Sequence, residues 1–230
     1  MTPTDAPPAA PSVPALVLCG GRGTRLGTDE EKPLVPVCGE PMLDRVVRAL
    51  DRSAVSAVHA VTSPATPETR DRARDLGLSV VDASGDGYVA DLQYALDVVP
   101  PPVLTVVADL PHLDAAHVDR ALSDAVVSDS DSGTDSDLDS GTDSDPDSGA
   151  DARTVASLTV CVPVELKRTL GVSVDSQFDH AGRAVAPTGL NVVGAGDGAE
   201  SENVSVVADE RLAVNVNRPG DREVAESRCD

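Results

Sequence analysis

The sequence predicts a three-layer α/β fold in which helices cover both faces of a mostly parallel central sheet. Three observations carry this prediction. Short apolar runs of buried-strand type alternate four times with segments of helical periodicity. A glycine-rich loop directly follows the first apolar run, and a carboxylate, Asp109, ends another one. Parallel strands need crossover connections of this kind, so alternation favours a parallel sheet.

The elements of the first half follow from apolar periodicity and helix-ending residues. Residues 13–19 form a continuous apolar run, and Met42, Val46, Val47 and Leu50 repeat at helical spacing. The second predicted helix ends at Gly77, a residue that favours the left-handed cap conformation. The expected strands cover residues 13–19, 54–62, 78–84 and 102–109, and the expected helices cover 41–53, 67–77, 87–99 and 114–127.

The second half is expected to extend the same sheet, because its elements are too few for an independent core. Strands are expected at residues 155–163, 184–194 and 211–217, with helices at 164–171 and 219–228. We therefore predict a disordered Pro/Ala-rich extension at residues 1–12 and one domain from 13 to 230. That domain is interrupted at 128–152 by a near-repeat with nine Asp and no Lys or Arg, which we expect to be disordered.

Composition excludes several classes of protein. The 230 residues carry a formal charge of −21, so neither nucleic-acid binding through a basic patch nor attraction to anionic lipid is expected. No apolar run approaches the length of a membrane span, and the N-terminus does not resemble a signal peptide. We expect a soluble cytoplasmic protein without membrane insertion. The general acid excess, with sixteen Arg against two Lys, is typical of halophilic proteins.

The four cysteines lie far apart in the sequence and form no C-x-x-C pair. Cys19, Cys38, Cys161 and Cys229 have almost no histidine near them. Neither a zinc cluster nor a disulfide framework is expected.

The strongest chemical signal is the loop at residues 18–27, LCGGRGTRLG, which is followed by EKPL at 31–34. Closely spaced glycines let backbone amides approach an anion, while Arg22, Arg25 and Lys32 add positive charge to an acidic chain. The loop lacks the Gly-Lys-Ser/Thr ending of a Walker A motif, and Leu26 breaks the dinucleotide fingerprint. The pattern therefore favours a phosphate site, and the alternative is a turn whose basic residues are merely solvated.

GGRGTRLG followed by EKPL resembles the signature of the Rossmann-like nucleotidyltransferases, which include sugar-nucleotide pyrophosphorylases and molybdenum cofactor guanylyltransferase. Segments 61–69, 83–92, 187–193 and 215–217 resemble, in that order, the archaeal GTP:adenosylcobinamide-phosphate guanylyltransferases of cobamide synthesis. The resemblance covers residues 13–226 except the Asp/Ser-rich insertion. It departs at Arg22, where Lys is common, and at Leu26, where Met is common.

The resemblance implies transfer of GMP from GTP to adenosylcobinamide phosphate, with Mg²⁺ as cofactor and pyrophosphate as the leaving group. The partners would be GTP and the phosphorylated acceptor. It implies catalytic roles for Arg25, Lys32 and Asp109, with Asp109 also the metal ligand. It implies nucleotide contacts from Gly20, Gly21, Arg22, Gly23, Thr24, Ser84, Gly85 and Gly87, and acceptor contacts from Gly189, Asn191, Asn215 and Asn217.

Position supports a metal-binding role for Asp109, because ligands of open α/β sheets bind at the carboxyl ends of the strands. The alternative role is an N-cap for the following helix. Asn215 and Asn217 lie two apart on a predicted strand and should face the same side. They could complete the metal or acceptor site, or simply lie on a solvated strand face.

Four other functions remain as alternatives. Guanylylation of molybdopterin or nucleotidylation of a sugar 1-phosphate would use the same fold, and a guanine-nucleotide binder would have a degraded version of the site. An interaction protein would act through the acidic tract. Residues 85–90 match G-x-G-x-x-A, the pattern of a dinucleotide dehydrogenase, but Asp86 would then place a carboxylate inside the pyrophosphate loop.

Overall fold

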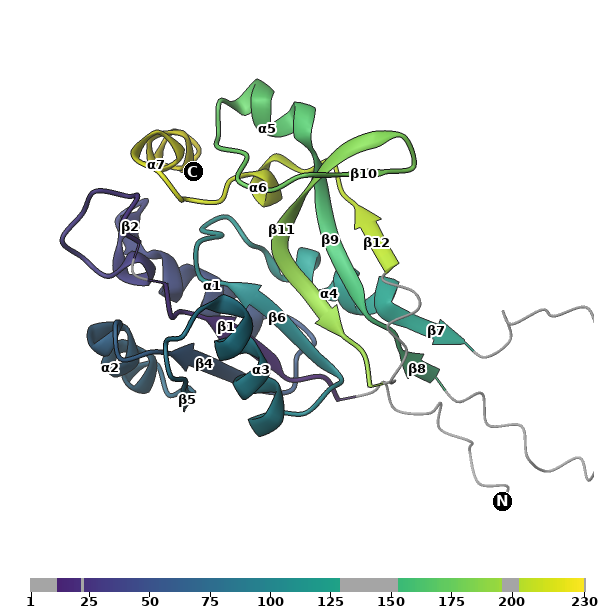
Figure 1. Cartoon of the computed structure of the whole chain (residues 1–230), viewed down its shortest axis with the longest axis horizontal. Coiled ribbons are helices and arrows are strands. Elements are labelled where there is room, and N and C mark those ends of the chain that lie inside the picture. The colour runs from purple at the N-terminus through teal and green to yellow at the C-terminus, as the bar shows by residue number, and fades with distance from the viewer. Residues whose placement is uncertain (1–11, 22, 129–152, 196–202, 230) are drawn as a thin grey trace, which may run out of the picture.

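The computed structural model describes residues 12–21, 23–128, 153–195 and 203–229. The expected extension at 1–12 and insertion at 128–152 lie almost entirely outside these residues. A central sheet runs in the order β12-β9-β11-β6-β1-β4-β5, with β10 added beside β11. Every pairing along this path is parallel except those of β11, which runs antiparallel to both β6 and β9. The predicted three-layer α/β fold with a mostly parallel sheet is confirmed (Figure 1).

The strands of the sheet bury Val, Leu and Ala. They are β1 (Ala15–Leu18), β4 (Val58–Thr62), β5 (Ser79–Asp82), β6 (Val103–Val107), β9 (Leu158–Pro163), β10 (Phe178–His180), β11 (Arg183–Val193) and β12 (Asn203–Val206). Two hairpin-like pairs lie apart from it, β2 (Pro36–Val37) with β3 (Glu40–Pro41) and β7 (Val126–Ser128) with β8 (Arg153–Val155).

Helices cover both faces of the sheet. The largest core cluster joins α1 (Met42–Asp51), α2 (Pro67–Asp75) and α4 (Ala115–Ala125) to one face. A smaller cluster joins α3 (Tyr88–Val98) to the opposite face, where α3 lies in front of the sheet in Figure 1. The carboxyl ends of β1, β4 and β6 lie between these layers and open toward the loops that precede α1, α3 and α4.

The C-terminal half places three short helices at one end of the sheet. These are α5 (Val164–Leu170), α6 (Glu210–Ala213) and α7 (Pro219–Glu226), all at the top of Figure 1. A separate apolar cluster ties this end to the segment around β2, through Val35, Val37, Val214, Val216 and Ala225 among others. Residues after α6 are thereby held against the N-terminal half of the chain.

Two details correct the sequence-based prediction. The strand expected at residues 211–217 is instead the end of α6 followed by an irregular segment, because Val214 and Val216 bury their side chains in this separate cluster rather than pair with the sheet. The sheet also gains β10 and β12, which lie in segments too polar for an apolar-run criterion. Between them, the strand expected at 184–194 and its neighbour at 155–163 are present as β11 and β9.

The expectation of no disulfide is wrong. Cys38, beside β2, is bonded to Cys229, just after α7, and their Cα atoms lie 5.5 Å apart. A separation of 191 residues concealed the pair, because only the packing of α7 near β2 brings the two cysteines together. Cys19 and Cys161 are buried and form no disulfide, and burial raises the pKa of the Cys19 thiol.

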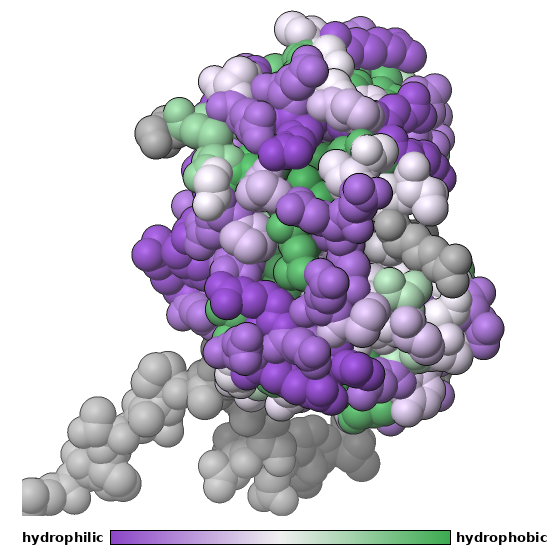
Figure 2. Space-filling view, turned by 90° about the vertical axis from the view of Figure 1, so that its left-hand side faces the viewer, coloured by the Kyte–Doolittle hydropathy of each residue, from purple (hydrophilic) through white to green (hydrophobic). Residues whose placement is uncertain are grey.

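Hydrophilic side chains cover most of the molecular face shown in Figure 2. Among the described residues, no helix has both the length and the apolar character needed to cross a membrane.

The charge of −21 predicts stability that depends on salt. At 0.1 M salt the Debye length is about 10 Å, and at 1 M it is about 3 Å, so repulsion within the acidic surface is strong only in dilute buffer. We expect partial unfolding below a few hundred millimolar KCl. Circular dichroism at 222 nm and thermal melting curves measure it. Sucrose at the same osmolality as the KCl is the control, because it separates charge screening from the exclusion of solute from the protein surface. An unchanged spectrum after desalting would contradict this prediction.

Candidate active site

A cavity of about 290 Å³ opens at the carboxyl ends of β1, β4 and β6. This edge is where ligands bind in open α/β sheets. Its walls come from five segments that are distant in sequence. The lining residues are Leu18, Cys19, Gly20, Gly21, Lys32, Pro33, Val61, Gly85, Gly87, Tyr88, Asp91, Val107, Ala108 and Asp109.

Two glycines of the loop after β1 pack too closely against their neighbours for larger side chains. A Cβ atom at Gly20 would lie 3.2 Å from an Asp91 carboxylate oxygen. Gly23 has a φ of +63°, and a Cβ there would lie 2.5 Å from the Cβ of Lys32. The loop can therefore approach both Asp91 and Lys32 only because it is glycine-rich.

Lys32 is the centre of the site. Its Nζ lies 2.5 Å from Asp109 Oδ2 and 2.6 Å from Asn217 Oδ1, so one ammonium joins the end of β6 to the segment after α6. The lysine begins a short 3-10 helix, Lys32–Leu34, whose next residue is Pro33. Its side chain is largely shielded from solvent, with 16% exposed. The ion pair is thus partly buried, where its interaction is less screened than at the surface.

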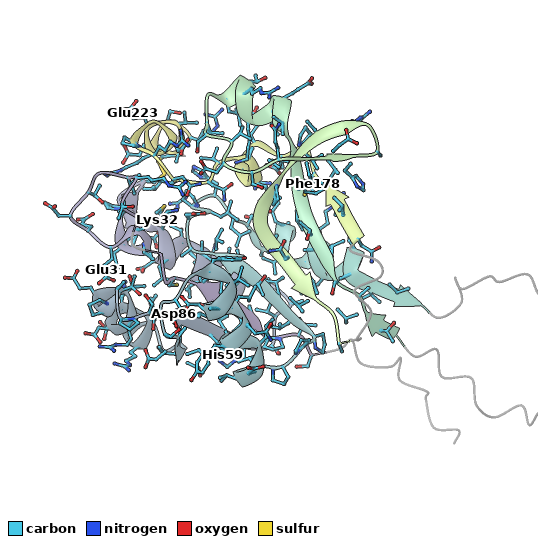
Figure 3. The ribbon with its side chains drawn as sticks, in the orientation of Figure 1. Glu31, Lys32, His59, Asp86, Phe178 and Glu223 are labelled. Atoms are coloured by element: carbon cyan, nitrogen blue, oxygen red, sulfur yellow. A yellow bond between two sulfur atoms is a disulfide. The ribbon has the colours of Figure 1, made fainter. Side chains whose placement is uncertain are left out.

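The residue before Lys32 fixes this segment in place. The Glu31 carboxylate accepts hydrogen bonds from the backbone amides of Glu68 at 2.9 Å and Thr69 at 2.7 Å, both in the first turn of α2. A carboxylate at a helix N-terminus satisfies amides that have no partner within the helix. Figure 3 shows Glu31 beside α2, with Lys32 next to it on the side toward the C-terminal helices.

The second oxygen of Asp109 is held by a buried amide network. Asn215 donates from Nδ2 to Asp109 Oδ1 at 3.1 Å and to the Thr188 carbonyl at 2.9 Å. Lys167, on α5, donates to Asn215 Oδ1 at 3.0 Å and to the Ala213 carbonyl at 2.8 Å. Both carboxylate oxygens of Asp109 are therefore oriented before any ligand binds.

Lys167 is 4% exposed, and burial lowers the pKa of its ammonium, although the charge of Asp221 opposes this shift. It was not singled out from the sequence. The composition could have pointed to Lys167, because Lys32 and Lys167 are the two lysines of the chain. Both belong to the network around Asp109.

The opposite wall of the cavity comes from the start of α3. Asp91, 8% exposed, accepts a hydrogen bond from the Gly85 amide at 2.8 Å and also faces Gly20. Ser63 donates from Oγ to the Gly20 carbonyl at 3.1 Å, which links the same loop to β4. Burial, with the charge of Asp109, raises the pKa of the Tyr88 hydroxyl. The sequence analysis assigned Asp91 and Tyr88 no role.

The structure brings together many of the residues implied by the resemblance. Gly20, Gly21, Lys32, Gly85, Gly87 and Asp109 line one cavity, Gly23 contacts Lys32, and Asn215 and Asn217 hydrogen-bond with Asp109 and Lys32. The two glycine-containing loops are thus two walls of one cavity, and Asp86, within the dehydrogenase-like pattern, is exposed (Figure 3).

Other implied residues lie away from this cavity. Thr24 and Ser84 are exposed and do not line it. The Arg25 side chain is 69% exposed, with one guanidinium nitrogen 3.5 Å from Asp175 Oδ1. Arg22 lies outside the described residues.

The two predicted acceptor residues on β11 differ in position. Gly189, with a φ of +84°, lies so close to Val107 that a Cβ would approach its Cγ2 to 2.5 Å, directly behind the cavity wall. Asn191 lies deeper in the sheet, opposite Thr105 of β6, and does not line the cavity.

The alternative role for Asp109, an N-cap of the following helix, belongs to Asp114. Asp114 caps α4, accepting a hydrogen bond from the Ala116 amide at 3.0 Å. Asp109 is therefore available to the site.

The donor set around Lys32 suits a hard divalent cation. Asp109 Oδ2 and Asn217 Oδ1 converge on one ammonium, which shows that these two oxygens can share a cation. Among the described residues there is no group of three or more His, Cys, Asp or Glu able to hold a metal. One carboxylate and one amide fit Mg²⁺, which typically takes few protein ligands and completes its shell with phosphate oxygens and water.

Comparisons with known proteins identify the family of this chain. The MobA-like NTP transferase domain matches residues 15–135. An adenosylcobinamide-phosphate guanylyltransferase from Methanocaldococcus jannaschii is 29% identical over 219 residues, covering 92% of this chain and 95% of the relative. A 2-C-methyl-D-erythritol 4-phosphate cytidylyltransferase from Saccharopolyspora erythraea is 50% identical over 54 residues, which is 24% of each chain.

Two solved structures share the fold. One, assigned as a glucose-1-phosphate thymidylyltransferase from Bacillus anthracis, has a TM-score of 0.60 at 12% identity and covers 95% of both chains. The other, a hypothetical transferase from Thermus thermophilus, has a TM-score of 0.50 at 21% identity and covers 80% of this chain and 66% of that one. The two structures show the fold, and the domain match over residues 15–135 places the chain in the MobA-like NTP transferase family, as a nucleotidyltransferase.

Proposed function

We propose that this protein transfers GMP from GTP to adenosylcobinamide phosphate, giving adenosylcobinamide-GDP and pyrophosphate, with Mg²⁺, in a halophilic cytoplasm. The proposal rests on the Lys32 ammonium, which donates hydrogen bonds to both Asp109 and Asn217 beside the glycine-rich loop. The full-length similarity to the guanylyltransferase of Methanocaldococcus jannaschii supports the choice of nucleotide and acceptor.

The reaction exchanges one phosphoanhydride bond for another. An oxygen of the acceptor phosphate forms a bond to the α-phosphorus of GTP, and the bond from that phosphorus to the β-phosphate oxygen breaks. The electron pair leaves with pyrophosphate. Because every participant is anionic, the protein must chiefly align the phosphates and offset their charge.

Each wall of the cavity has a task in this proposal. Backbone amides from Gly20 to Gly23 bind the triphosphate, and Lys32 turns its ammonium from Asp109 to the phosphates. With Asp109 and Asn217 as its protein ligands, Mg²⁺ would offset the charge of the phosphates when bound. Gly85 and Gly87, which line the opposite wall, border the guanosine together with Ser84.

The acceptor side of the site is proposed to lie toward β11. The side-chain amide of Asn215 bonds both Asp109 and the carbonyl of Thr188, the residue before Gly189. This contact supports a position for the acceptor phosphate between Asp109 and the β11 turn, with Asn191 reached only by the more distant part of the acceptor.

The first test measures the pyrophosphate released from GTP and Mg²⁺ at molar KCl, with three acceptors supplied separately. We expect turnover with adenosylcobinamide phosphate, and little with molybdopterin or glucose 1-phosphate. Replacing GTP by ATP tests whether the enzyme selects guanine over adenine. Preferred turnover of either other acceptor would overturn the assignment, and GTP binding without turnover of any acceptor would favour the non-catalytic alternative.

The second test removes the charge of Asp109. Asp109→Asn keeps the shape of the side chain and a hydrogen-bond acceptor for Lys32, but it removes the charge that would bind the metal. It should therefore lower kcat/KM by about 10² to 10³-fold. Asp97→Asn, at an exposed position of α3, makes the same charge change and should retain wild-type activity. Melting temperatures of both variants check folding. Activity of Asp109→Asn within threefold of wild type would remove Asp109 from the mechanism.

A further inference from the structure

A second cavity, of about 410 Å³, lies behind α1 and shares no lining residue with the nucleotide cavity. Arg45 and Arg48 come from α1, and Arg52 follows its last turn. Arg211 comes from α6, and Arg228 from the segment after α7. Five arginines therefore meet in a chain whose formal charge is −21.

Carboxylates near the cavity offset only part of this charge. Glu40 accepts hydrogen bonds from the Arg48 guanidinium at 2.5 and 2.6 Å and lies 3.8 Å from Arg45. Glu210 accepts from Arg228 at 3.2 Å, and Asp209 accepts from Arg211 at 3.0 Å. Of the residues that line the cavity, five are arginines, and Asp114 and Glu210 are the acids.

Several donors in the cluster keep capacity for a ligand. Arg52 is exposed and forms no ion pair with any residue that the structure describes. The Nε of Arg228 is buried without a hydrogen-bond partner, which costs free energy unless a ligand or water satisfies it. Burial, together with the neighbouring charge of Arg48, lowers the pKa of Arg45. Crowded positive charges of this kind favour an added anion.

The first turn of α4 contributes to the same cavity. Ala115, the first residue of α4, lines it beside Asp114. The N-terminus of an α-helix carries a partial positive charge and amides that point outward. Asp114 already caps this helix and accepts from the Ala116 amide, so the attraction for an anion comes from the arginines.

We propose that this arginine-lined cavity binds a compact phosphorylated anion, at a site separate from the nucleotide cavity. A phosphoryl group carries more charge than a carboxylate and offers three oxygens, so it can accept from several guanidinium groups at once. This advantage is needed where the ligand must compete with Glu40, Asp114 and Glu210. The inference does not depend on the identity of the transferred nucleotide.

The test is a titration of the ¹⁵N-labelled full chain with sodium pyrophosphate at constant ionic strength. Two-dimensional NMR spectra monitor the backbone amides at each step. Pyrophosphate could also enter the nucleotide cavity, so the readout must be local. We expect saturable shifts of the Arg48, Arg52 and Ala115 amides, which persist in Lys32→Met. Arg52→Gln should weaken binding at this site by about three- to tenfold.

Arg74→Gln is the matched control, because it removes an exposed arginine of α2 that lies outside the cavity. It should leave the affinity at the cavity unchanged. The proposal is overturned if the Arg48, Arg52 and Ala115 amides do not shift, or if all pyrophosphate-dependent shifts disappear in Lys32→Met. Equal weakening by Arg52→Gln and Arg74→Gln would also overturn it, since net charge alone would then explain binding.

Discussion

The ammonium of Lys32 is the contact on which the site depends. It joins Asp109, at the end of β6, to Asn217, which lies 185 residues away from Lys32 in sequence. Glu31 fixes the same segment to α2, while Asn215 and Lys167 fix the other oxygen of Asp109. A carboxylate held from both sides pays little ordering entropy when a cation or phosphate arrives.

The distribution of charge separates two functions of the basic residues. Both lysines are in the network around Asp109: the compact ammonium of Lys32 donates to a carboxylate and an amide, and that of Lys167 donates to an amide and a backbone carbonyl. Arginines instead form ion pairs across the surface and gather in the cavity behind α1. The acid excess elsewhere makes these few positive regions the places where an anion can approach the chain.

Much of the fold and part of the site could be predicted from the sequence. Apolar runs located β1, β4, β5, β6, β9 and β11, because strands that lie between two layers of helices carry mostly apolar residues. Asn215 and Asn217 hydrogen-bond with Asp109 and Lys32, but they lie on an irregular segment and not on the predicted strand. Their common direction therefore comes from tertiary packing of Val214 and Val216, which strand periodicity did not describe. Lys167, Asp91 and the Cys38–Cys229 disulfide depend on long-range packing and left no local pattern to detect.

We propose that Lys32, Asp109 and Asn217 form a site for a cation and a triphosphate together. Isothermal titration calorimetry of the wild-type protein with GTP, at molar KCl, with and without Mg²⁺, is the decisive measurement. We expect saturable binding of GTP that tightens when Mg²⁺ is present. Binding of GTP that is indifferent to Mg²⁺, or no binding in either buffer, would contradict it.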